Sequence, residues 1–193
     1  MKNIILIGAG GHANSVYDVI KSTKKFKVEK ILDNNLKKNS KFNNIKIFDK
    51  NFFLKENKLK KNIHLSFGSI YNLKIRHNLI KNLEIKRIYK FPIIISPRSY
   101  ISKNVKILTG SIIMHNSIIN YGASISKHVV INTGAIIEHD VSINDNSHIS
   151  TGVIVNGGVT IGKNCFIGSG SVIRENVKIP DNSFIKMGSI IKK

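Results

Sequence analysis

The sequence of 193 residues has one cysteine, few acidic residues and no long apolar run. The single thiol, Cys165, excludes a disulfide framework within one chain, which is typical of proteins in the reducing cytoplasm. The apolar run that follows Met1 is too short for a signal peptide or a membrane span and ends in glycines. We therefore expect a cytoplasmic protein that does not associate with a membrane.

The scarcity of acids leaves 31 Lys and Arg against 11 Asp and Glu, a formal net charge of +20. Residues 1–92 carry +15 of this charge and residues 93–193 carry +5. Lysine, isoleucine and asparagine share AT-rich codons, so genome composition accounts for much of the excess. No basic stripe interleaved with aromatics and no nucleic-acid motif occurs. We expect an anionic small-molecule substrate, which the charge attracts over long range, and no nucleic acid.

The C-terminal half repeats every six residues. Each sixth position from Ile95 to Ile191 is isoleucine, except for Val155, and the residue four places later is always Ser, Val, Ala or Cys. A period of six is neither helical nor that of a single strand, and it indicates a solenoid. One inward aliphatic residue per hexad predicts three short strands and eighteen residues per coil. An ice-binding prism would need a Thr-x-Thr ladder, which is absent.

The first ninety residues follow a different pattern. We expect a buried strand over Lys2–Ile7, a glycine turn over Gly8–His12 and a helix over Ala13–Lys21. A helix that begins directly after such a turn offers backbone N–H groups and its dipole to an anion. Ala13 stands where the dinucleotide fingerprint requires a third glycine, so this signal is incomplete.

A second and a third strand complete a small unit. The second strand, Val28–Leu32, ends in Asp33, and an acid at this place commonly receives a ribose hydroxyl. The third strand, Ile63–Phe67, precedes a helix over Tyr71–Leu83. The segments predict a Rossmann-like βαβαβ domain over residues 1–92, large enough for one nucleotide, with a hinge at its end formed by Lys90-Phe91-Pro92.

The hexad pattern resembles that of the hexapeptide-repeat acyltransferases, whose repeats form a left-handed parallel β-helix. With the nucleotide-binding unit, the chain resembles the acetyltransferases of nucleotide-linked amino sugars and the sialic acid O-acetyltransferases. The most specific match is Asn132–Asp140, followed by Asn146–Ser150 and Ile161–Gly168. The expected fold is therefore α/β plus all-β, with a left-handed β-helix over residues 93–193.

The resemblance implies transfer of the acetyl group of acetyl-CoA directly to the amine of a sugar linked to a nucleoside diphosphate. It assigns His139 as the general base, Asp140 as the acid that orients it and Asn132 as a polar neighbour of the reacting groups. It places acetyl-CoA in a groove between the solenoids of a homotrimer and involves no metal. The implied acetyl-CoA contacts are His148, Gly157, Ser169 and Met187. The implied nucleotide-sugar contacts are Gly10, Gly11, His12, Asp33, Asn34 and Gly68.

The spacing places His139 in a column of residues eighteen apart, where the next member, Gly157, leaves room for a thioester arm. Two alternatives stay open: O-acetylation of sialic acid or another sugar, and a catalytically silent protein that binds nucleotide sugars. The second is favoured by the lack, before Lys193, of the C-terminal Gly-x-Pro-Ala loop common in the family. A zinc enzyme of the γ-carbonic-anhydrase kind is discounted because no H-x4-H pair occurs.

Overall fold

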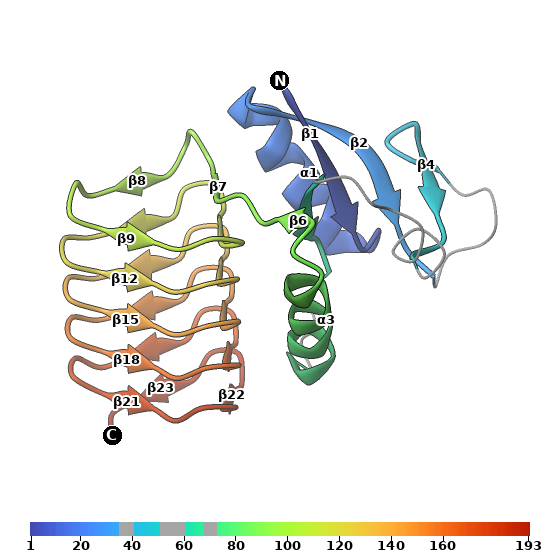
Figure 1. Cartoon of the computed structure of the whole chain (residues 1–193). Helices are drawn as coiled ribbons and strands as arrows, with labels where there is room; N and C mark the ends of the chain where they lie inside the picture. Colours follow the sequence, from blue (N-terminus) through green and yellow to red (C-terminus); the bar gives the residue numbers. More distant parts are fainter. Residues whose placement is uncertain (35–40, 51–60, 68–72) are drawn as a thin grey trace. The chain divides into compact units, whose positions relative to one another are not determined.

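The computed structural model describes residues 1–34, 41–50, 61–67 and 73–193 (Figure 1). These residues form two compact units, and each has its own apolar core. The N-terminal unit comprises Met1–Ser69 and Leu79–Pro92, whereas Ile70–Asn78 group with Ile93–Lys193. We call residues 93–193 the solenoid.

The N-terminal unit is built on one six-stranded sheet with the strand order β3-β4-β2-β1-β5-β6. All neighbouring strands are parallel except β3 and β4, which form a hairpin. The elements in chain order are β1 (Lys2–Ile7), α1 (Gly11–Thr23), β2 (Phe26–Leu32), β3 (Lys41–Phe42), β4 (Ile45–Phe48), β5 (Lys61–Leu65), α3 (Leu73–Ile85) and β6 (Tyr89–Lys90).

The predicted βαβαβ unit is present in this sheet, with small shifts in its boundaries. Helix α1 begins at Gly11, two residues earlier than expected, because Gly10 serves as its N-cap. The hairpin β3–β4 and strand β6 were not predicted, since segments of two to four residues are too short to show a period. Lys90 belongs to β6, where it pairs with Asn62, and is not part of a hinge.

The solenoid has the predicted three strands per coil, and residues eighteen apart pair in parallel register. We name its three sheets after their first strands. The β7 sheet holds β7 (Ile94–Ile95), β10 (Ile112–Ile113), β13 (Val130–Ile131), β16 (His148–Ile149), β19 (Phe166–Ile167) and β22 (Phe184–Ile185). The β8 sheet holds β8 (Tyr100–Ile101), β11 (Ile118–Ile119), β14 (Ile136–Ile137), β17 (Ile154–Val155), β20 (Val172–Ile173) and β23 (Ile190–Ile191). The β9 sheet holds β9 (Lys106–Ile107), β12 (Ser124–Ile125), β15 (Ser142–Ile143), β18 (Thr160–Ile161) and β21 (Lys178–Ile179).

The second residue of each strand belongs to the isoleucine series and points inward. From Ile113 to Ile173 every member of that series is fully buried, and so are the small residues of the corners, such as Ala135 and Ser147. Cys165 occupies one of these corner positions, and burial raises the pKa of its thiol. This residue therefore packs the core, as its place in the hexad predicts.

From residue 110 onward, each corner of the solenoid turns through one residue with a left-handed backbone. Every sixth residue from Gly110 to Gly188 has a positive φ, between 55° and 77°. Only glycine, asparagine, His128 and Asp140 occupy these positions. Glycine has no Cβ penalty there, and Asn, Asp and His are the side chains that tolerate this conformation best. The corners thus have their own sequence requirement beside that of the core.

Removing one member of the inner isoleucine column should destabilise the solenoid strongly. Ile143 is fully buried, so Ile143→Ala is expected to lower the free energy of unfolding by about 2–5 kcal/mol. Ser142 is the adjacent residue, and its side chain lies on the outer face of the same strand. Ser142→Ala should change the stability by less than about 0.5 kcal/mol. Urea denaturation of both variants tests this, and equal losses would contradict the assigned register.

Candidate active site

The candidate base and its neighbour lie in the corner between β14 and β15. Nδ1 of His139 is 3.0 Å from Oδ2 of Asp140. Both side chains are about two-thirds exposed, with 65% for His139 and 67% for Asp140. Because the carboxylate can only accept, this contact places a proton on Nδ1 and leaves Nε2 as the acceptor. The imidazole is thus oriented and accessible to a ligand.

Two glycines in neighbouring coils make room for these side chains. A Cβ added to Gly157, one coil after His139, would lie 2.5 Å from Cε1 and 2.6 Å from Nε2 of the imidazole. A Cβ added to Gly122, one coil before Asp140, would lie 2.3 Å from the carboxylate oxygen Oδ1. The imidazole therefore lies across the backbone of Gly157, and the carboxylate lies across that of Gly122.

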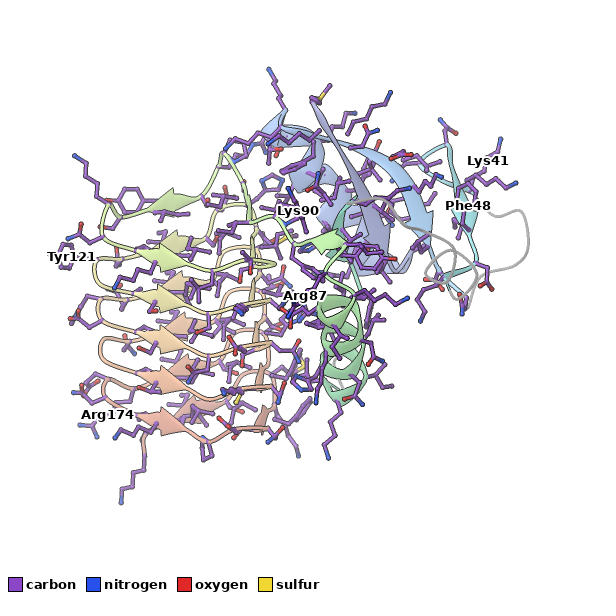
Figure 2. The ribbon with its side chains drawn as sticks, viewed as in Figure 1. Lys41, Phe48, Arg87, Lys90, Tyr121 and Arg174 are labelled. Carbon is purple, nitrogen blue, oxygen red and sulfur yellow. The ribbon has the colours of Figure 1, made fainter. Side chains whose placement is uncertain are left out.

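The corner continues as a column of exposed polar and aromatic residues. Tyr121 and Arg174, labelled in Figure 2, project from the same edge of the solenoid. The Nε of Arg174 donates to Oε1 of Glu175 at 2.9 Å, and this hydrogen bond lowers the pKa of Glu175. Glu175 follows Gly157 one coil later, so this ion pair and His139 lie on either side of Gly157 along the column. The period of eighteen aligns Tyr121 with His139, whereas Arg174 was not singled out from the sequence.

Other candidate residues lie on the opposite edge of the β8 sheet. In the corner before β14, Nδ2 of Asn132 is 3.5 Å from Nε2 of His148. His148 is buried, and its ring packs against Phe166 with 5.3 Å between the ring centroids. Ser169 and Met187 occupy the same corner one and two coils after Thr151 and are exposed.

The proposed catalytic and donor-binding residues therefore form two groups in one chain. His139, Asp140 and Gly157 share the corner after the β8-sheet strands. Asn132 belongs with His148, Ser169 and Met187 in or beside the corner before those strands. One chain does not bring the two groups together.

The glycine turn of the N-terminal unit lies at the carboxyl end of β1. Gly8 has a φ of +106°, and a Cβ there would lie 2.8 Å from Cβ of Phe67, so this position requires glycine. A Cβ at Gly10 or Gly11 would meet nothing within 4 Å. The first turn of α1, which includes His12, contains no acidic residue, and no side chain caps its N-terminus at Gly10. The turn has the geometry of an anion site.

Both polar residues at the end of β2 are held by backbone N–H groups. Oδ2 of Asp33 accepts from the N–H of Ala9 at 2.8 Å, which ties the acid to the glycine turn. Oδ1 of Asn34 accepts from the N–H of Lys50 at 2.7 Å. Gly68, the last predicted nucleotide-sugar contact, lies outside the described residues.

Arg76 is a further buried polar residue that the sequence did not single out. Its guanidinium donates to the carbonyl of His128 at 2.8 Å and to the side-chain oxygen of Asn146. Burial lowers the pKa of Arg76 to about 10, so it stays charged at neutral pH. Nδ1 of His115 lies 2.6 Å from the hydroxyl of Ser96. His115 and His128 are thus engaged in packing and not placed beside His139.

The described part of the chain was searched for metal-binding groups and for membrane-spanning helices, and it contains neither. Across residues 1–34, 41–50, 61–67 and 73–193, no group of three or more His, Cys, Asp and Glu residues could hold a metal ion. Among the helices described, none combines the length and the apolar character needed to cross a bilayer.

Two family models match the sequence. Residues 3–83 match the PglD N-terminal domain, and residues 158–193 match the bacterial transferase hexapeptide of six repeats. The sequence is thus similar to a PglD N-terminal domain in its first part and to hexapeptide transferase repeats at its end. The family recognition made from the glycine turn and the hexads is confirmed. No sequence among the curated proteins matches this chain.

Solved structures share this two-part fold. The acetyltransferase domain of PglB from Neisseria gonorrhoeae has a TM-score of 0.91 and 24% identity, covering 100% of this chain and 92% of that chain. PerB from Caulobacter crescentus, solved in complex with CoA and GDP-perosamine, has a TM-score of 0.88 and 22% identity, covering 100% and 90%. The PglB domain in complex with acetyl coenzyme A has a TM-score of 0.88 and 24% identity, covering 98% and 92%. These matches confirm a Rossmann-like domain followed by a left-handed parallel β-helix.

Filling the space above Gly157 should displace the imidazole without unfolding the hexapeptide repeats. Gly157 does not have a positive φ, so the backbone tolerates alanine there, but the new Cβ collides with the ring. In Gly157→Ala we expect the imidazole resonances of His139 to shift in NMR spectra, while the thermal midpoint stays within a few degrees of the wild type. Unchanged imidazole resonances would contradict the placement of the ring across Gly157.

Proposed function

We propose that this protein transfers the acetyl group of acetyl-CoA to the amine of a sugar linked to a nucleoside diphosphate. The observation that carries the proposal is the exposed His139–Asp140 pair, whose imidazole has its free nitrogen over Gly157. The combination of a PglD N-terminal domain with transferase hexapeptide repeats supports the same activity. So do the structural relatives, one of which was solved with CoA and GDP-perosamine.

The His139–Asp140 geometry supports a direct transfer with His139 as the general base. The sugar amine attacks the carbonyl carbon of the thioester, so that a C–N bond forms and the C–S bond breaks. Nε2 of His139 takes the proton that the amine loses, and the thiolate of CoA then receives that proton. Oδ2 of Asp140 accepts a hydrogen bond from the Nδ1–H group, 3.0 Å from Nδ1, and this contact fixes the tautomer and stabilises the imidazolium formed.

The acetyl donor would bind along the solenoid, with its thioester above Gly157. Glycine at this position lets the imidazole lie across the backbone, and a larger residue would displace the ring from this place. His148, Ser169 and Met187, which the family resemblance assigns to acetyl-CoA, would line this groove from the opposite corner of a neighbouring chain.

The acceptor would be held by its diphosphate at the N-terminus of α1. The open backbone at Gly10 and Gly11 and the absence of an acid in the first helical turn favour a bound phosphate. Asp33, tied to Ala9, would accept a ribose hydroxyl. His12, in the first turn of the same helix, would contact the phosphate side of the ligand.

We further infer that the active form is a homotrimer that associates through the β8 sheet. The outward column of this sheet is apolar in every strand, whereas that of the β9 sheet holds only Lys, Ser and Thr. A continuous apolar column on one face is typical of a buried interface. The residues of the apolar column are Tyr100, Ile118, Ile136, Ile154, Val172 and Ile190.

This interface would also complete the site. The corners that flank the β8 sheet carry the two separated groups, His139 with Asp140 on one edge and Asn132 with Ser169 on the other. A second chain packed on this sheet would set the His139 corner of one chain beside the opposite corner of its neighbour. The family resemblance supports three subunits, and the apolar column of the β8 sheet supports this face as their interface.

Loss of the base should abolish turnover without unfolding the protein. His139→Ala is expected to reduce kcat by about 10²- to 10⁴-fold, since it removes the proton acceptor. Asp140→Asn should reduce kcat less than His139→Ala does, because the imidazole remains as the proton acceptor. The measurement is release of CoA thiol from acetyl-CoA with a panel of nucleotide-linked amino sugars.

Treating the product of this assay with hydroxylamine distinguishes N-acetylation from O-acetylation. An N-acetyl product resists hydroxylamine, whereas an O-acetyl ester is cleaved by it. Full activity of the His139→Ala variant would contradict the assignment of the base. An ester product would overturn the amine as the acceptor.

A charge in the apolar column should dissociate the trimer. The Ile136 side chain is half-buried in the single chain, and Ile136→Lys would place an ammonium group in the interface. Light scattering after gel filtration should then give one third of the wild-type mass. Ser142→Lys, on the polar β9 sheet, adds the same charge and should leave the mass unchanged. A monomeric wild type, or a trimeric Ile136→Lys variant, would contradict this interface.

A further inference from the structure

One face of α1 is turned toward the β3–β4 hairpin. The rings of Tyr17 and Phe42 meet edge to face there, with 6.0 Å between their centroids. Because residues three or four apart share one face of a helix, Ile20 and Lys21 follow Tyr17 on this face, one turn later. At this turn the helix and the strands surround a cavity of about 360 Å³.

The walls of the cavity are mainly apolar. Tyr17 and Ile20 of α1, Phe26 and Val28 of β2 and Ile45 of β4 line it. Ile20 and Val28 are buried, and the other three are half-buried. The volume lies at the lower end of the roughly 300–1,000 Å³ that is usual for small-molecule sites, whose walls are also mainly apolar. The cavity therefore has room for one short hydrocarbon chain.

The charged members of the lining are two exposed lysines, Lys21 and Lys27. No acidic residue of the described chain lines the cavity. Three more exposed lysines, Lys2, Lys24 and Lys25, lie where β1 and β2 begin, and the N–H of Lys2 donates to the carbonyl of Lys25 at 2.9 Å. A cluster of ammonium groups attracts an anion, whereas the apolar walls favour hydrocarbon. The cavity thus suits a ligand that has both parts.

The cavity is separate from the sites described above. It lies at the amino ends of the parallel strands, whereas the glycine turn follows the carboxyl end of β1. The six residues of β1 separate the two places by about 20 Å. His139 belongs to the other compact unit. A ligand in the cavity would therefore leave the nucleotide-sugar site free.

We propose that this cavity binds the hydrocarbon chain of a free, single-chain anionic amphiphile of medium length, of the fatty acid class. The chain fills the space between α1 and β2, and the carboxylate faces Lys21 and Lys27. This binding does not depend on the proposed acetyl transfer.

A series of linear carboxylates tests the proposal on the full chain. Hexanoate, octanoate and decanoate would be titrated below micelle formation, with methyl NMR of Ile20, Val28 and Ile45 as the readout. Each added CH2 group should tighten binding about fourfold, which corresponds to about 0.8 kcal/mol, until the cavity is full. Longer chains should then gain little. Octanol, which lacks the charge, should bind about threefold more weakly than octanoate.

Three variants locate the ligand. Lys27→Glu should weaken the binding of octanoate and leave that of octanol unchanged. Lys81→Glu is the matched control, because Lys81 is exposed on α3 and does not line the cavity, and it should leave both unchanged. Ile45→Trp should fill the cavity and abolish the binding of all four compounds, with the thermal midpoint as a check on folding.

Several outcomes would overturn the proposal. They are equal binding of octanol and octanoate, equal losses in Lys27→Glu and Lys81→Glu, and methyl shifts spread over the isoleucines of the solenoid. Binding to phosphatidylglycerol vesicles without any response to free octanoate would also overturn it, since the ligand would then be a bilayer surface.

Discussion

The left-handed residue in the corners from Gly110 to Gly188 is the constraint on which the arrangement of the site depends. Because each corner from Gly110 to Gly188 turns at the same place in the hexad, every coil contains eighteen residues and every column stays in register. The residue before the left-handed position always faces outward at the corner. His139 holds that place, and Asp140 holds the left-handed position itself. An aspartate there both permits the turn and presents a carboxylate to the neighbouring imidazole.

Space in the adjacent coils makes this corner chemically distinct. Other corners contain asparagine ladders, such as Asn146 Nδ2 donating to Asn164 Oδ1 at 2.9 Å, whose amide groups satisfy one another. The His139 corner instead has Gly122 on one side and Gly157 on the other, and both side chains of the pair lie across glycine backbone. The same repeat that elsewhere stabilises the wall thus holds an exposed imidazole–carboxylate pair at this corner. The apolar β8 sheet beside it offers a surface that a second chain would cover.

The solenoid could be predicted from the sequence because the period is strict and each coil buries aliphatic and small residues at the same positions. The sequence also placed Gly157 beside His139, since a period of eighteen aligns them. The contact between His139 and Asp140 was not predictable from adjacency, because it depends on the left-handed backbone of Asp140. Two further columns can be seen in the sequence. One is the series of Gly, Asn, His and Asp residues at the corners, and the other is the apolar series from Tyr100 to Ile190. Only the structure shows which face of the solenoid each column occupies. The hydrogen bond from the Lys50 N–H to Asn34 depends on a residue two positions after the end of β4 and has no sequence signal.

The most direct test of this account is a crystal structure of the protein with CoA and a nucleotide-linked amino sugar bound together. We predict that the sugar amine lies within hydrogen-bond distance of Nε2 of His139, about 2.6–3.2 Å, with the CoA sulfur over Gly157. The Nδ1 contact to Asp140 should persist. An amine bound far from His139, with the imidazole directed into solvent, would contradict the account.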